Sequence, residues 1–215
     1  MHHARQHAET RTRERRRRLA HEAARLMAEG GIRDFHMAKR KAAERLGIHD
    51  DASLPRNSEI EDALREYQRL FLGDAQAAGL RQRRDAALRA LEFFAEFDAR
   101  LVGPVLDGTA DRYSPVALHL YTDDVDSVAR HLDAHAIPAE ARARRVRFDR
   151  ERAGDVPVWV FSAEDLTFDL TVLPRDALRQ SPLSAIDEKP MKRASLTQLR
   201  ALIAEDEIAG YEAGD

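Results

Sequence analysis

The chain has 215 residues, a formal net charge of −3 and no cysteine. This length suits one large domain or two small ones with a real core, and the missing cysteines exclude disulfides, thiolate metal ligands and a cysteine nucleophile. No apolar run reaches the roughly 18 residues of a membrane span, and the basic N-terminus has no apolar signal region, so we expect a cytoplasmic protein without a membrane partner.

Charge is unevenly distributed along the chain. Residues 1–45 contain 13 Lys and Arg against six Asp and Glu (net +7), whereas the remainder carries 22 against 32 (net −10). This asymmetry is typical of proteins that contact a polyanion, although a solvated basic helix shows the same pattern. If nucleic acid is the partner, phosphate contacts should come from Arg15, Arg16, Arg17, Arg18, Lys39 and Lys41.

Helical periodicity fills the first hundred residues. Apolar side chains recur at helical spacing, as in Leu19, Ala23 and Met27, and Gly30 ends that pattern. Asp34 has the side chain of an N-cap for the second helix. We predict disorder over residues 1–10 and helices over residues 10–29, 34–48, 57–71 and 76–98.

The pattern changes to strand alternation in the second half. We predict strands over residues 116–121, 143–148, 156–161 and 166–173, with the last two joined as a hairpin. A helix after Asp124 should turn Val125, Val128 and Leu132 inward, and a final helix should cover residues 195–208. The predicted fold class is therefore α+β: a helical domain over residues 11–98 packed on a small mixed β-sheet in a domain over 99–210, with disorder over 211–215.

The segment from Leu101 to Asp124 has the frame of a phosphate and metal site. It contains a glycine turn at Gly103, a spacer of ten residues and an alternating strand. Two carboxylates placed two residues apart on a strand point to the same face, where they can hold Mg²⁺ against a triphosphate. A glycine turn just upstream lets backbone N–H groups approach a phosphate.

This frame resembles that of the DNA polymerase β-like nucleotidyltransferases, and residues 180–194 resemble the tail of uncharacterised proteobacterial proteins of that kind. Pro115 and Ala117 stand at the paired carboxylate positions, and Asp169 matches the third carboxylate, which makes it the candidate catalytic residue. The resemblance covers about residues 88–205 and implies a nucleotidyltransferase-like core. It also implies a nucleotide site at Gly103, Gly108, Arg112, Ser114 and His119, with Arg144 or Arg145 nearby.

Pro and Ala cannot bind a metal ion, so the leading hypothesis is a catalytically degenerate protein that binds a nucleotide or polyanion. One alternative is an active nucleotidyltransferase that needs Mg²⁺ and uses displaced carboxylates at Asp107, Asp111, Asp123 and Asp169. The other is a nucleic-acid-binding or regulatory protein that acts through the basic N-terminal helices, because residues 19–48 faintly resemble the opening helices of TetR-type regulators.

Overall fold

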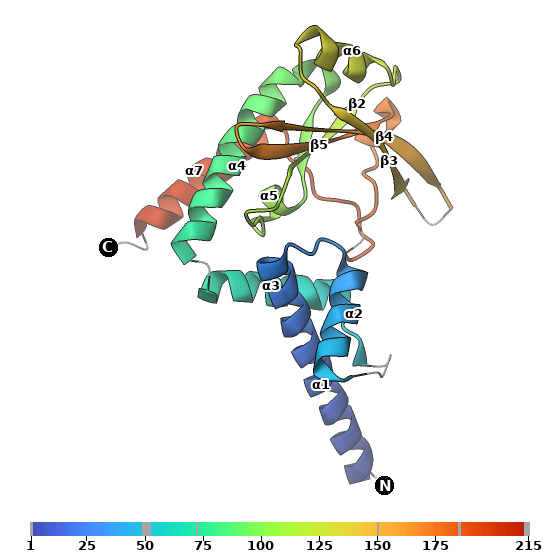
Figure 1. The fold of residues 1–215 in the computed structure, drawn as a ribbon, viewed down its shortest axis with the longest axis vertical. Coiled ribbons are helices and arrows are strands. Elements are labelled where there is room, and N and C mark those ends of the chain that lie inside the picture. Colours follow the sequence, from blue (N-terminus) through green and yellow to red (C-terminus); the bar gives the residue numbers. More distant parts are fainter. Residues whose placement is uncertain (1, 49–52, 72, 150, 185, 213–215) are drawn as a thin grey trace. The chain divides into compact units, whose positions relative to one another are not determined.

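The computed structural model describes residues 2–48, 53–71, 73–149, 151–184 and 186–212 (Figure 1). Within these residues, seven α-helices and a five-stranded mixed sheet confirm the predicted α+β class. The chain divides into two compact units, of which the first holds residues 1–76 and 185–188 and the second holds 77–184 and 189–215. In the described part of the chain, no helix is long and apolar enough to span a membrane.

Three helices form the first unit: α1 (His2–Gly30), α2 (Phe35–Leu46) and α3 (Asn57–Phe71). Small side chains line their contacts, because Ala23 and Ala24 of α1 and Ala38 and Ala42 of α2 are completely buried. Ile60 of α3 packs into the same cluster. The helix α1 begins at His2, so it extends through the segment that the sequence predicted to be disordered.

Predicted capping chemistry fixes the ends of α2. The Asp34 carboxylate accepts the Met37 N–H at 2.6 Å, as expected for an N-cap. Gly47 ends the helix at φ 62°, and its N–H bonds the carbonyls of the last turn. At the start of α3, the Glu59 carboxylate accepts the Arg56 N–H at 2.6 Å.

The second unit contains most of α4 and the whole sheet. Its elements are α4 (Gly73–Phe93), η2 (Ala95–Phe97), β1 (Arg100–Val102), α5 (Pro104–Asp107), β2 (Val116–Tyr121), α6 (Ser127–Ala134), β3 (Glu140–Arg147), β4 (Ala153–Ala163), β5 (Leu166–Leu173), η3 (Arg175–Leu178) and α7 (Leu196–Glu212). The strand order is β1-β2-β5-β4-β3, and β2 and β5 are the parallel pair. The units divide after residue 76 and not near residue 98 as predicted, because α4 packs on the sheet and belongs with it.

Strand predictions were accurate where alternation or turn chemistry was strong. The bounds of β2 and β5 match the predicted ranges, and β4 and β5 form the predicted hairpin. Glu164 and Asp165 connect them with φ values of 52° and 62°, the conformation of a two-residue hairpin turn. Other details were wrong. The three-residue strand β1 was not predicted, and β3 spans Glu140–Arg147 where the prediction was 143–148. Val125 is 52% exposed because α6 begins only at Ser127.

The two faces of the sheet differ in chemistry. One face, which includes Leu118 and Leu170, packs in the main core with side chains of α4 and α7. Figure 1 shows these two helices side by side, and ion pairs such as that between Arg200 and Glu92 join them. The opposite face carries His119 of β2 and Asp169 of β5, so polar chemistry is concentrated there.

Candidate functional site

The parallel pairing of β2 and β5 brings together two positions of the predicted site. In the register of these strands Ala117 lies beside Asp169. Val102 of β1 pairs with Ala117 from the other side, and Gly103 follows it. A Cβ atom on Gly103 would lie 4.0 Å from the Ala117 Cβ, and the backbone of Gly103 has φ 71°, which favours glycine. Three positions distant in the sequence therefore meet on one face of the sheet.

An arginine from the edge strand occupies this face. Arg144 of β3 reaches across β4 and binds both oxygens of Asp169, with Nη1–Oδ1 at 2.9 Å and Nη2–Oδ2 at 2.6 Å. Its Nη1 also donates to the Thr171 hydroxyl at 2.9 Å. The Asp169 side chain is 14% exposed, whereas that of Arg144 is 46% exposed. The carboxylate is thus engaged in a two-bonded ion pair whose cation remains reachable from solvent.

His119 is the register partner of Thr171 and lies close to this ion pair. It is 5% exposed, and its Nδ1 atom is buried with no hydrogen-bond partner among the described residues. Burial is the main cause that lowers the pKa of His119 to about 4; Arg144 and Arg193 act in the same direction, and Asp169 opposes them. The imidazole is therefore neutral near pH 7.

Arg193 adds a second cation close to this histidine. Its Nη1 donates to the Tyr121 hydroxyl at 3.2 Å and to the carbonyl of Ala177 at 3.0 Å. The guanidinium also lies 5.9 Å from the centre of the Tyr121 ring. These contacts with a hydroxyl, a carbonyl and an aromatic ring orient the Arg193 guanidinium at the end of β2.

The residues at the predicted metal position do not fit a magnesium ion. Mg²⁺ is held by oxygen ligands, and neither Pro115 nor Ala117 offers a side-chain oxygen. Asp169 offers two, but both accept hydrogen bonds from Arg144. Over residues 2–48, 53–71, 73–149, 151–184 and 186–212, no group of three or more His, Cys, Asp or Glu side chains is placed to hold a metal.

The displaced carboxylates serve local structure at separate places. The Asp111 carboxylate accepts the Tyr113 N–H at 2.8 Å, and Asp123 accepts the Arg175 N–H at 3.0 Å. Asp107 lies 3.9 Å from the Lys192 ammonium. The structure therefore does not bring Asp107, Asp111 and Asp123 together with Asp169.

Two buried arginines of α4 hold the glycine turn and its spacer. Arg83 donates from Nε to the Ser114 carbonyl at 2.9 Å and from Nη2 to the Arg112 carbonyl at 2.8 Å. Arg84 donates to the Val105 carbonyl at 3.2 Å and forms an ion pair with Asp206. Sequence reasoning missed both residues, because an arginine on a helix is usually exposed and nothing local indicates its distant carbonyl partners.

The remaining predicted nucleotide-binding residues have structural partners in this segment. The Ser114 hydroxyl accepts the Asp111 N–H at 2.9 Å and lies in a buried position. Gly108 ends α5 with φ 77°. Arg112 is exposed and stacks over the Tyr113 ring at 4.8 Å. Of the predicted set, Gly103 adjoins Ala117, and His119 lies close enough to Asp169 for that charge to act on its pKa.

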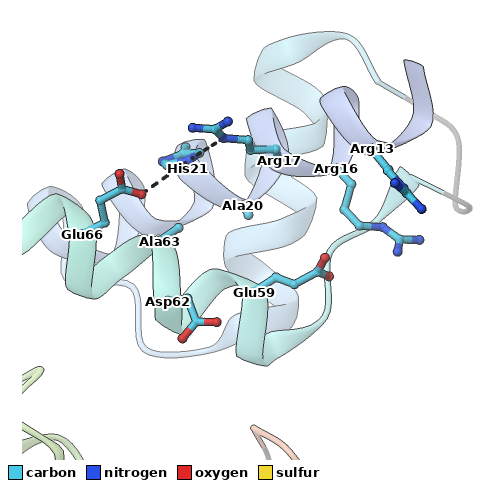
Figure 2. Close-up of a pocket in the computed structure, with 9 residues that line it drawn as sticks. All are labelled: Arg13, Arg16, Arg17, Ala20, His21, Glu59, Asp62, Ala63 and Glu66. Carbon is cyan, nitrogen blue, oxygen red and sulfur yellow. Dashed lines mark hydrogen bonds and ion pairs between the residues drawn. The ribbon is translucent and has the colours of Figure 1, made fainter. Parts of the chain in front are cut away.

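The basic part of α1 faces an acidic part of α3 within the first unit. A groove with a volume of about 480 Å³ lies between the two helices. Figure 2 shows that α1 lines it with Arg13, Arg16, Arg17 and His21, and α3 with Glu59, Asp62 and Glu66. His21 and Glu66 lie 3.9 Å apart. Arg15 and Arg18 are exposed outside this groove, as is Lys41 of α2, whereas burial lowers the pKa of Lys39. Part of the predicted basic cluster is thus compensated by α3, and the nucleic-acid contact stays a prediction.

Comparisons with protein-family models, with curated proteins and with solved structures found no match to this chain.

Proposed function

We propose that the protein binds a nucleotide, or another phosphate-bearing ligand, on the polar face of β2 and β5 and does not transfer a nucleotidyl group. The observation that carries the proposal is the Arg144 guanidinium, which lies half-exposed beside Asp169 and next to Ala117. A guanidinium presents a planar fork of donors that matches the oxygens of a phosphate as well as those of a carboxylate.

Access to this guanidinium is favoured by the small residues beside it. Ala117 is partly exposed and lies beside Asp169, and Gly103 is partly exposed and lies next to Ala117, so these two positions present only small side chains to a ligand. His119 is a neutral ring near pH 7, so it contributes no charge of its own to the site. The site therefore combines a half-exposed guanidinium, paired with one carboxylate, with small uncharged neighbours.

Binding without transfer follows from the side chains at the carboxylate positions. Nucleotidyl transfer by the resembled enzymes depends on carboxylates that position a metal ion on the triphosphate. Pro115 and Ala117 cannot do this, and Asp169 is already bound by Arg144. A nucleotide would then be held as a ligand and released unchanged.

A thermal-shift screen tests this proposal. Full-length protein is heated with ATP, GTP, CTP or UTP, each in EDTA and again in Mg²⁺. At least one nucleotide should raise the melting temperature in EDTA, because a ligand at a hundredfold excess over its Kd stabilises the folded state by about 2.7 kcal/mol. A shift that occurs only with Mg²⁺ would contradict the proposal, as would the absence of a shift with all four nucleotides.

A further inference from the structure

The contacts of Asp169 show that its charge is already balanced within the fold. Each carboxylate oxygen accepts a bond from a different nitrogen of Arg144, and Nη1 of that guanidinium also reaches Thr171. Thr171 is 1% exposed and stands two residues after Asp169 on the same face of β5. One strand thus provides two side chains that hold a single guanidinium in a fixed place.

The neighbouring strand β2 adds no second negative charge at the register position beside Asp169. Ala117 is the register partner of Asp169, and it carries only a methyl group. One guanidinium is enough to neutralise one carboxylate, whereas two carboxylates at paired positions would call for a divalent ion. The nearby arginine Arg142 is not available for this role, because it binds Glu140 with both Nε and Nη2.

We infer that the Arg144 guanidinium is the permanent cation of this site and takes the position beside Asp169 that a divalent metal ion would need. The inference that Arg144 is the cation of the site depends only on the ion pair with Asp169. What the site then binds depends on the proposed function. Its consequence is that the wild-type chain binds no divalent ion here, and that the metal site can be restored by two substitutions.

The restoring variant combines Arg144→Ala with Ala117→Asp. It removes the guanidinium and places a second carboxylate beside Asp169 on the adjacent strand, facing the same side of the sheet. Free Mn²⁺ is measured by electron paramagnetic resonance as full-length protein is titrated in, because bound Mn²⁺ loses the sharp signal of the free ion. The double variant should bind Mn²⁺ at least about tenfold more tightly than the wild-type protein does.

The matched control combines Arg142→Ala with Ala117→Asp. Arg142 lies on the same strand and points to the same face as Arg144, but its hydrogen bonds go to Glu140, and it acts on Asp169 only as a more distant charge. This control should bind Mn²⁺ more weakly than the restoring variant, because Arg144 still occupies both oxygens of Asp169. Equal Mn²⁺ affinity in the two double variants, or tight Mn²⁺ binding by the wild-type protein, would overturn the inference.

If the restoring variant does not fold, the combination of Arg144→Gln with Ala117→Asp provides the test in its place. Glutamine keeps a polar side chain but carries no charge, so the two paired carboxylates are left without the guanidinium. Mn²⁺ should then raise the melting temperature of this second double variant and leave that of the wild-type protein unchanged; an equal response of the two proteins would overturn the inference. Because these experiments contain no nucleotide, they can succeed or fail independently of the proposed function.

Discussion

Replacing Arg83 by Met should destabilise the second unit by about 3 kcal/mol, which is a large effect for a single substitution. Arg83 is 6% exposed and donates to the carbonyls of Ser114, Arg112 and Gly79. Methionine has a similar volume but no donor, so the buried Ser114 carbonyl would lose its hydrogen bond to the guanidinium. An unsatisfied buried acceptor is costly because the folded protein offers it no water.

Urea unfolding followed by tryptophan fluorescence measures this effect. The chain has one tryptophan, Trp159, and it lies on β4 of the second unit, so the signal reports on the unit that contains Arg83. Arg81→Met is the matched control, because Arg81 is an exposed residue of the same helix and should change the free energy of unfolding by less than about 0.5 kcal/mol. If the two variants unfolded at the same urea concentration, Arg83 would not hold the segment from Arg112 to Ser114.

Lowering the pH from about 6.5 to about 4 should weaken the second unit through His119. Its pKa is about 4 in the folded protein and 6.5 in the unfolded chain, so between these values the unfolded chain binds a proton that the folded protein excludes. Stability contributed by the neutral histidine is therefore fully present above pH 6.5, falls as the pH falls, and reaches its lower limit near pH 4. The loss amounts to about 3 kcal/mol over this range.

The variant His119→Asn isolates this contribution. Carboxylates also titrate in this range, so the quantity to compare is the difference in the free energy of unfolding between variant and wild type at each pH. That difference should shrink or reverse in favour of His119→Asn as the pH falls. Parallel stability curves for His119→Asn and wild type would contradict the assigned burial of His119.

Local patterns were sufficient to predict the parts of the fold whose structure depends on near neighbours. Alternation in Val116–Tyr121 and Leu166–Leu173 gave both strands of the parallel pair with correct bounds, because side chains of period two define a strand. Asp34 was correctly identified as a cap, since its partner is only three residues away. The juxtaposition of residue 117 with Asp169 could also be expected, but only from the resemblance and not from the alternation itself.

Long-range partnerships could not be predicted in the same way. Arg83 and Arg84 show no local sign of burial, because the carbonyls that accept their hydrogen bonds lie about twenty or more residues further along the chain. The acidic side chains of α3 that line the groove with Arg16 and Arg17 are also distant from them in the sequence. Counting charges over residues 1–45 therefore overestimated how basic the surface of α1 is. The boundary between the units was misplaced for the same reason, since the helical period does not indicate what a helix packs against.

The central claim is that the polar face around Arg144 binds a phosphate ligand without a divalent ion. Its most direct test is an NMR titration of the ¹⁵N-labelled full-length chain with an equal mixture of ATP, GTP, CTP and UTP in EDTA. We predict saturable shifts of the Arg144 side-chain Nε–H signal and of the backbone amides of His119, Asp169 and Thr171, with the amides of α2 and α3 unchanged. Unchanged signals around Arg144, or shifts confined to the basic residues of α1, would contradict the account.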